Sequence, residues 1–357
     1  MGAGVRCART VALLVLLAGW AVAAPASVRW ADALRQPAEW YGTPAAAALA
    51  DTVLLYQDAT GGWPKNTDFS QPPTAEYRAR READRAPTID NGGTTTPLRF
   101  VAQVAAAGAE PRHRAAVLRG IDYLLVAQYA NGGWPQYHPL RPGYYTHITY
   151  NDNAMVNVLN LLREVRDARA PFGWVDPARR KGAELAVARG IECILRTQVR
   201  QGGRLTAWCA QHDEHTLAPA WARNFEPPAL SGQESVGIVR FLMAVEPPTP
   251  EIIAAIEGAV AWLRAVQVKG LRVEDFTGAD GQRDRRTVAD PAAPPLWARF
   301  YDLETNRPVF AGRDQVLHAS LDAIERERRV GYAYLGTWPA SLLERDYPRW
   351  RARWVRP

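Results

Sequence analysis

The chain has 357 residues, of which 47% are hydrophobic and 22% are charged, and its formal net charge is +6. A chain of this length can bury one large core. Its three cysteines exclude a disulfide-rich scaffold, and the sequence contains no CxxC metal motif. The positive charge favours an acidic partner.

The N-terminus has the pattern of a signal peptide. Two arginines precede an apolar run over 11–22, which is too short for a comfortable membrane span. We predict that residues 1–23 are removed and that residues 24–357 form a single domain. The mature chain would be secreted or periplasmic, without stable membrane association. An exported protein meets acidic polymers other than nucleic acid, so no nucleic acid is expected as a partner. Cys193 and Cys209 remain and could form one disulfide.

A similar helix end occurs four times along the chain. Its copies read LLYQDATGGWPK from 54, LLVAQYANGGWPQ from 124, ILRTQVRQGGRLTAW from 194 and WLRAVQVKGLRV from 262. The glutamines recur at Gln57, Gln128, Gln198 and Gln267, with spacings of 71, 70 and 69 residues. This period indicates a repeat architecture. The glycine after each apolar stretch is typical of a helix C-cap.

Each helix end is followed by a polar segment and a second predicted helix. Apolar residues at helical spacing predict these second helices over 95–107, 152–166, 231–245 and 314–328. Strand signals are few, and a piece such as 271–276 could at most form a small hairpin. We therefore predict an all-α toroid of repeated helix pairs, with the second helix of each pair inside. The parallel inner helices would bring their N-termini and long loops together at one rim.

Acid and amide side chains occur together at two of the predicted inner helix starts. Asp90 precedes Asn91, and Asp152 precedes Asn153. Helix capping explains either pair, because Asp and Asn are preferred N-cap residues. The alternative is a Ca²⁺ site, since carboxylate and amide oxygens are suitable ligands. Neither pair resembles an EF-hand loop, so both explanations stay open.

The segment over 207–235 is long and polar for a connector, which is typical of a functional loop. Its His212, Asp213 and His215 suggest a metal site or an acid-base relay, although a third clear zinc ligand is missing. Arg223 follows in the same segment, and a salt bridge with a nearby glutamate is its simplest role. Further basic residues follow the repeated motifs, at Lys65, Arg299 and Arg313.

Seven longer motifs occur in order along the mature chain. They are GGWPKN at 61–66, TIDNGGTT at 88–95, NGGWPQYHP at 131–139, HITYNDNAM at 147–155, TAWCAQHD at 206–213, WARNFEPPALSGQESVGIVRFLM at 221–243 and WARFYDLETNRPVFAGRD at 297–314. Together they resemble the family 10 polysaccharide lyases, the family 10 pectate lyases. The resemblance implies an (α/α)₃-type toroid whose groove binds polygalacturonate (pectate). It also implies calcium-assisted β-elimination that leaves 4,5-unsaturated oligogalacturonides.

The resemblance also implies roles for single residues. By motif, Asp152 would be the principal calcium ligand, with Asp90 and Asn91 beside the metal and the substrate carboxylate. Arg223 would be the base that removes the C5 proton. Asn153 departs from the pattern, because an acid is expected there in some relatives. The residues that would hold uronate carboxylates are Lys65, Arg299 and Arg313.

The chemistry makes one demand on Arg223. A free arginine has a pKa above about 12, so almost none is basic at neutral pH. Burial and neighbouring cations favour the neutral form. We therefore expect activity to be greatest at alkaline pH.

Other classes of protein share parts of this pattern. A terpenoid cyclase is also an α-toroid, but the sequence has no Asp-x-Asp-Asp motif. A toroidal glycoside hydrolase would use Asp90 and Asp152 as acid and base. A noncatalytic protein that binds acidic polysaccharides is the third alternative. Trp63 and Trp134 could stack on sugars or belong to the core. No sequence marker indicates an oligomer, so a monomer is expected.

Overall fold

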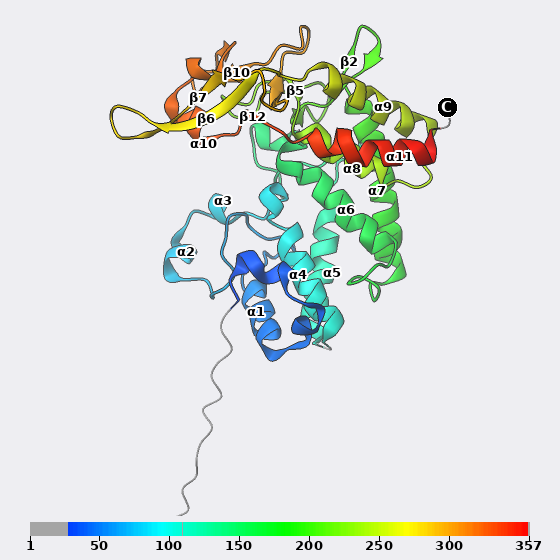
Figure 1. The fold of residues 1–357 in the computed structure, drawn as a ribbon. Helices are drawn as coiled ribbons and strands as arrows, with labels where there is room; N and C mark the ends of the chain where they lie inside the picture. Colours follow the sequence, from blue (N-terminus) through cyan, green and yellow to red (C-terminus); the bar gives the residue numbers. More distant parts are fainter. Residues whose placement is uncertain (1–27, 109, 356–357) are drawn as a thin grey trace, which may run out of the picture.

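The computed structural model describes residues 28–108 and 110–355, and Figure 1 shows how their helices and strands are arranged. The predicted signal peptide at 1–23 lies outside these residues. Within the described ranges, no helix combines the length and the apolar character that crossing a membrane requires.

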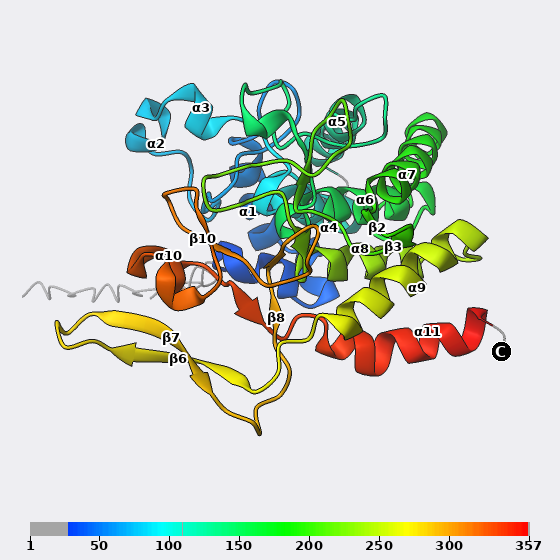
Figure 2. The ribbon, with the colours of Figure 1, turned by 90° about the horizontal axis from the view of Figure 1, so that it is seen from above.

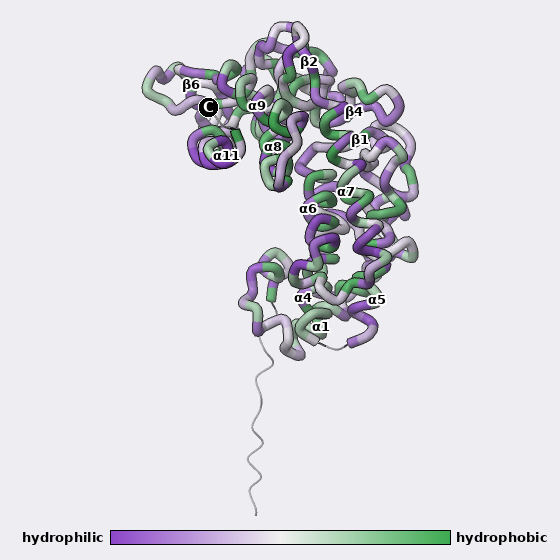
Figure 3. The backbone as a smooth tube through the Cα atoms, turned by 90° about the vertical axis from the view of Figure 1, so that its right-hand side faces the viewer, coloured by the Kyte–Doolittle hydropathy of each residue, from purple (hydrophilic) through white to green (hydrophobic). Residues whose placement is uncertain are grey.

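The helices form pairs that follow one another along the chain. The pairs are α4 (Thr95–Ala107) with α5 (Pro111–Val126), α6 (Ala154–Arg166) with α7 (Pro177–Thr197), and α8 (Glu234–Met243) with α9 (Pro250–Ala265). Helix α1 (Pro44–Leu54) packs against α4 and α5. Helix α6 lies between α4 and α8, and α7 lies between α5 and α9. In Figure 3 the successive pairs follow an arc, with α1 near one end and α9 near the other.

The same side-chain contacts join neighbouring repeats. Amide groups of Gln57, Gln128 and Gln198 donate to a carbonyl of their own loop and to one in the next outer helix. An indole N–H from each repeat donates to the carbonyl four residues before its glutamine position, and the donors are Trp63, Trp134, Trp208 and Trp297. Trp63 and Trp134 are fully buried. Both therefore belong to the core, where each indole N–H binds a carbonyl near the end of the outer helix of its own repeat.

The fourth repeat contains an insertion. A hairpin of β6 (Leu271–Thr277) and β7 (Arg283–Ala289) separates its helix end from Trp297. The backbones of Val268 and Leu296 pair at the base of this insertion. Figures 1 and 2 show the hairpin projecting beside the helices. The indole of Trp297 thus reaches the same position as in the other repeats after a longer path.

The prediction of an all-α fold is wrong. The described residues contain twelve strands, paired in antiparallel twos. Besides β6 and β7, these are β1 (Ile148–Thr149) with β4 (Gln211–His212), β2 (Arg200–Gln201) with β3 (Arg204–Leu205), β5 (Leu230–Ser231) with β9 (Phe300–Tyr301), β8 (Trp297–Ala298) with β12 (Leu335–Gly336), and β10 (Phe310–Ala311) with β11 (Leu317–His318). Three of the six pairs, β1 with β4, β5 with β9 and β8 with β12, join loops that are distant in sequence, so their pairing depends on the tertiary fold and leaves little local pattern.

The helix predicted over 314–328 is also wrong. This stretch contains β11, a 3₁₀ turn over Leu321–Ala323 and the first residues of α10 (Arg326–Gly331). Its apolar residues Leu321 and Ile324 pack in a small separate cluster with Phe300 and Tyr334. Their spacing resembles that of a helix face, but these residues pack between loops and not on a helix.

The remaining helical segments are short. They are α2 (Ala75–Ala79), α3 (Glu82–Arg85), α11 (Tyr347–Trp354), 3₁₀ turns over Trp30–Arg35, Ala38–Gly42, Asp90–Gly92, Tyr144–Thr146 and Asn151–Asn153, and a π turn over Leu342–Asp346. Cys193 and Cys209 are both free and buried, so no disulfide joins them.

Candidate active site

Loops from successive repeats meet at one cavity of about 140 Å³. The loop after Trp63, the starts of α4 and α6 and the loop over 221–228 all contribute to its walls. Its lining residues are Lys65, Asn66, Asp90, Asn91, Gln136, Tyr144, Asn151, Asp152, Arg223 and Glu226. Among the residues predicted for the site, the structure brings Lys65, Asp90, Asn91, Asp152 and Arg223 together here.

The starts of α4 and α6 have the same unusual backbone. Asn91 has φ 49° and ψ 30°, and Asp152 has φ 50° and ψ 31°. Both residues therefore have the left-handed backbone conformation, which Asn and Asp tolerate better than most residues. Neither helix has a side-chain cap hydrogen bond at its N-cap. The capping explanation of these acid and amide pairs therefore does not hold.

Asn153 turns away from the cavity. It is absent from the lining residues and packs against α8, where a methyl group on Gly237 would meet its Oδ1 at 1.9 Å. The amide at this position contacts a helix partner and leaves the charge of the cavity unchanged.

Lys65 and Asp90 form an ion pair on one wall. Asp90 is only 5% exposed, and its Oδ1 has no hydrogen-bond partner within residues 28–108 and 110–355. An unsatisfied buried carboxylate oxygen is costly unless a cation or another donor binds it. Burial lowers the pKa of Lys65, but the charge and hydrogen bond of Asp90 outweigh this effect and raise it. Lys65 is therefore fully charged at neutral pH.

Asp152 lies above a buried arginine. One terminal nitrogen of Arg299 donates to Glu234 Oε1 at 2.6 Å, to Asp152 Oδ1 at 3.1 Å and to Asn151 Oδ1 at 3.3 Å. Arg299 is 4% exposed, and its guanidinium lies 4.4 Å from the ring centroid of Tyr332. Burial lowers the pKa of Arg299, but Glu234, Tyr332 and Asp152 outweigh it and raise the pKa. This buried cation holds the Asp152 carboxylate in place.

Arg223 is paired with Glu226, and both side chains line the same cavity. Its Nε donates to Glu226 Oε2 at 2.8 Å, and a terminal nitrogen binds the other carboxylate oxygen. The Tyr332 hydroxyl donates to Glu226 Oε1 at 3.0 Å. Burial lowers the pKa of Arg223, but the hydrogen bonds and charge of Glu226 outweigh it and raise the pKa. In this state Arg223 is a cation.

The charged side chains that line the cavity do not balance. The described lining residues include three carboxylates and two cations, so their net charge is −1. The Arg299 and Glu234 pair beneath them adds no net charge. A small cavity with this charge favours a bound cation over an anion.

Comparison with known proteins identifies the family. A family model described as pectic acid lyase matches residues 57–343. The chain belongs to this family. Two solved structures of a family 10 polysaccharide lyase from Cellvibrio cellulosa are similar to it. One is a variant in complex with trigalacturonic acid, 33% identical, covering 92% of this chain and 96% of that chain with a TM-score of 0.74. The other is 34% identical, covering 91% and 94%, with a TM-score of 0.74.

These matches confirm the resemblance to family 10, and the protein is a polysaccharide lyase. No curated protein sequence gives a significant match to the chain.

Arg313 lies outside the cavity lining of this pectic acid lyase. Its side chain is 59% exposed and pairs with Glu327 at 3.0 Å. Its carbonyl accepts a hydrogen bond from Asn224, next to Arg223. The uronate contacts predicted for Arg299 and Arg313 stay predictions, and the burial of Arg299 leaves little of its surface for a substrate.

Sequence reasoning missed several residues of the lyase site. Repeat position could have found Gln136, which follows its tryptophan by two residues as Lys65 and Arg299 do. Glu234 follows Ser231 by three residues, as Asp152 follows Thr149. Tyr332, Tyr144 and Asn66 carry no such signal.

The histidines predicted as metal ligands or as a relay have other roles. His212 is fully buried, with Nδ1 at 2.9 Å from the carbonyl of Leu217 and Nε2 accepting from the amide of Cys209. Burial lowers the pKa of His212 to about 4. Both ring nitrogens are thus used within the loop, and His215 is largely exposed.

Another group on the lyase has metal-ligand character. His147, Asp213 and Glu214 place one ligand atom each within 4.8 Å of one another. His147 Nδ1 lies 3.0 Å from Glu214 Oε2, so a hydrogen bond accounts for these two. Calcium prefers oxygen ligands, which the cavity supplies through Asp90 and Asp152. The donor set of the cavity therefore fits Ca²⁺ better than this group does.

Proposed function

We propose that this lyase cleaves polygalacturonate by calcium-assisted β-elimination, with Arg223 as the base that removes the C5 proton. The products are 4,5-unsaturated oligogalacturonides. The related lyase from Cellvibrio cellulosa was solved with trigalacturonic acid, which supports a uronate polymer as the substrate.

The charge of the cavity carries the proposal. An anionic polymer would be repelled by lining residues with a net charge of −1, so a further cation is needed for binding. Asp90 offers a buried oxygen without a partner, and Asp152 and Asn91 offer further oxygens nearby. These are the residues we assign to calcium. When bound, calcium supplies positive charge that offsets the second negative charge developing on the substrate carboxylate.

The side chains of the lyase would then do the following work. Lys65 orients and neutralises a uronate carboxylate. Arg223 accepts the C5 proton, the electron pair of that C–H bond forms the C4–C5 double bond, and the C4–O bond breaks. Solvent protonates the departing oxygen. Cations placed where charge develops stabilise the transition state more than the ground state.

Arg223 must lose a proton before it can act as the base. The pair with Glu226 opposes this, because it raises the pKa of Arg223. A bound cation and a rearranged Glu226 would both lower that pKa. The rate should therefore increase with pH through the neutral and alkaline range.

We also propose that residues 1–23 direct export, and that the mature lyase works as a monomer, either secreted or in the periplasm. The arginines and apolar run at the N-terminus support export. Nucleic acid is not a proposed partner.

The test follows ultraviolet absorbance while residues 24–357 act on polygalacturonate, with calcium or with a chelator, at neutral and alkaline pH. Absorbance from a conjugated double bond that grows only with calcium is the expected result. New reducing ends without absorbance would show hydrolysis and overturn the proposal. Absorbance that persists with the chelator would remove calcium from it.

A further inference from the structure

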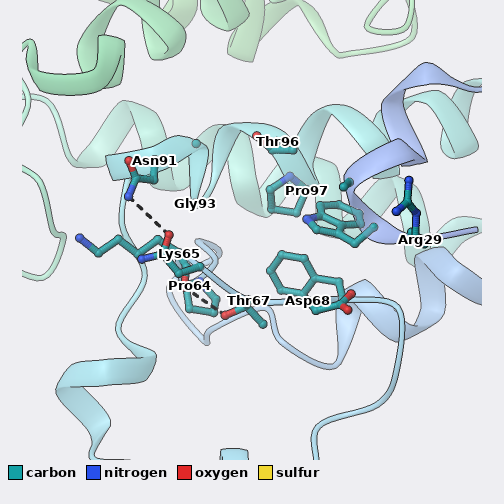
Figure 4. Close-up of a pocket in the computed structure, with 14 residues that line it drawn as sticks. Arg29, Pro64, Lys65, Thr67, Asp68, Asn91, Gly93, Thr96 and Pro97 are labelled. Carbon is teal, nitrogen blue, oxygen red and sulfur yellow. Dashed lines mark hydrogen bonds between the residues drawn. The ribbon is translucent and has the colours of Figure 1, made fainter. Parts of the chain in front are cut away.

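A second, larger cavity adjoins the catalytic one. Its volume is about 470 Å³, within the range of about 300 to 1,000 Å³ that is usual for small-molecule sites. Lys65, Asn66 and Asn91 line both cavities. Figure 4 shows Lys65 and Asn91 at one end of the larger cavity and Arg29 at the other, with Thr96 and Pro97 on the wall between them. A polymer chain that left the catalytic cavity past these shared residues would enter this space.

The far wall is built by the first described residues of the chain. The backbone N–H of Trp30 donates to the Ser70 hydroxyl at 2.9 Å. The indole ring packs edge-on against Phe69 and Phe100, with centroid distances of 4.8 and 5.5 Å. These contacts fix the segment that carries Arg29 beside the cavity.

Arg29 retains donor capacity on this wall. Its Nε and one terminal nitrogen bind Asp32 Oδ2 at 2.9 and 2.6 Å. The other terminal nitrogen has no hydrogen-bond partner among the described residues, and the side chain is 83% exposed. A guanidinium that keeps one carboxylate can still donate to a second one.

The chemistry of the walls suits a uronate residue. A galacturonate unit presents hydroxyl groups, an apolar C–H face and one carboxylate. Amides of Asn66 and Asn91 and the hydroxyl of Thr96 can bind hydroxyl groups, and the ring of Trp30 can cover an apolar face. Asp68 also lines the cavity, and its negative charge opposes a uronate.

We propose that this cavity is a distal saccharide subsite that binds a further galacturonate residue of the chain, with Arg29 as the partner of its carboxylate. The inference rests on the proposed function, since a polygalacturonate chain carries a carboxylate on every unit. It gives the lyase a preference for chains long enough to reach from the catalytic cavity to Arg29.

The chain offers a matched control for Arg29. Arg35 also pairs with Asp32, at 3.1 Å, and its side chain is 77% exposed, but it does not line the cavity. Arg29→Ala should lower kcat/KM on hexagalacturonate by about two- to fivefold, as expected for an exposed ionic contact. The same variant should leave trigalacturonate unchanged, and Arg35→Ala should leave both substrates unchanged. Asp68→Asn should raise kcat/KM on hexagalacturonate, because it removes a like charge.

Equal behaviour of the two arginine variants on hexagalacturonate would overturn the subsite, as would an equal loss by Arg29→Ala on both chain lengths. Calorimetric titration of the unmodified chain and Arg29→Ala with both oligomers separates this inference from the proposed function. If the unmodified chain has no lyase activity, the proposed function fails. A loss of hexagalacturonate affinity in Arg29→Ala would still support the subsite in that case. Unchanged affinity would refute it.

Discussion

Arg223 and Arg299 each pair with a glutamate and lie against the ring of Tyr332, yet the protein holds them differently. Arg299 is nearly buried, with its guanidinium 4.4 Å from the ring centroid and with both Glu234 and Asp152 as partners. Arg223 lies 5.9 Å from the same centroid, its side chain is 43% exposed, and its carboxylate partner is Glu226.

The difference indicates that Arg299 is a fixed cation that supports the site, whereas Arg223 can change its partner and its protonation. Arg299 is held by acids at the starts of α6 and α8, and releasing it would leave buried charges unpaired. Arg223 belongs to a loop and can exchange Glu226 for another partner at lower cost. The proposed base must lose its proton, and of the two arginines Arg223 is the one that is more exposed and has a single carboxylate partner.

Replacing Arg223 gives the largest expected effect. Arg223→Ala removes the proposed base, and kcat on polygalacturonate should fall by about 10² to 10⁴, the range typical of a positioned acid or base. Unsaturated product measured by absorbance gives the rate. Arg179→Ala is the control, because Arg179 forms a similar two-pronged pair with Asp122 between α5 and α7. If Arg223→Ala keeps more than a tenth of the rate, Arg223 is not the base, and the proposed difference between Arg223 and Arg299 fails.

Replacing Arg299 should affect stability first. Arg299→Met leaves Glu234, which is 1% exposed, without its ion-pair partner, so the free energy of unfolding should drop by about 3 to 5 kcal/mol. Denaturant titration measures this loss. Adding Glu234→Gln to the same chain should restore part of it, because the unpaired charge is then removed. Full stability of the single variant would show that Arg299 is not held as described.

Much of this arrangement was predictable from the sequence. The glutamine period and the apolar spacing predicted the helix pairs, including the bounds of α4 over 95–107. The prediction that polar motifs meet at one rim placed Lys65, Asp90, Asp152 and Arg223 near one another, and these four side chains line one cavity. Arg313, predicted for the same rim, does not line it. These features were predictable because they depend on short sequence motifs that recur at the same place in each repeat.

The parts that sequence did not predict depend on contacts between distant segments. Half of the strand pairs join loops far apart in the chain, as Leu230 pairs with Tyr301, and they contributed to the failure of the all-α prediction. The burial of Arg299 follows from acids more than 60 residues away. Tyr332 lies beyond the recognised motifs, and its place between the two arginines has no local sign.

Replacing Glu226 sharpens the comparison through pH. Glu226 raises the pKa of Arg223, and the basic form exists above that pKa. Glu226→Gln lowers the pKa, so the rise of kcat with pH should move to lower pH. Rates measured across the alkaline range test this, with Asp122→Asn as the control at the Arg179 pair. A pH profile that stays in place or moves to higher pH would mean that the proton on Arg223 does not limit the rate.

The smallest expected effect comes from the hydroxyl of Tyr332. Tyr332→Phe keeps the ring beside both arginines but removes the hydrogen bond to Glu226 Oε1. Glu226 then has more capacity to bind Arg223, so the pKa of Arg223 should rise and the pH at which kcat increases should move upward. The rate at a fixed neutral pH should fall by about two- to tenfold, as for one hydrogen bond.

Tyr334→Phe is the matched control, because the Tyr334 hydroxyl donates to the carbonyl of Ala311 and not to Glu226. The sign of the shift decides the interpretation. If Tyr332→Phe and Glu226→Gln move the pH profile in opposite directions, Glu226 acts on the proton of Arg223, and Tyr332 tunes that action. If both lower the rate without moving the profile, the tyrosine and the glutamate only position a guanidinium that stays charged, and Arg223 would then resemble Arg299 after all.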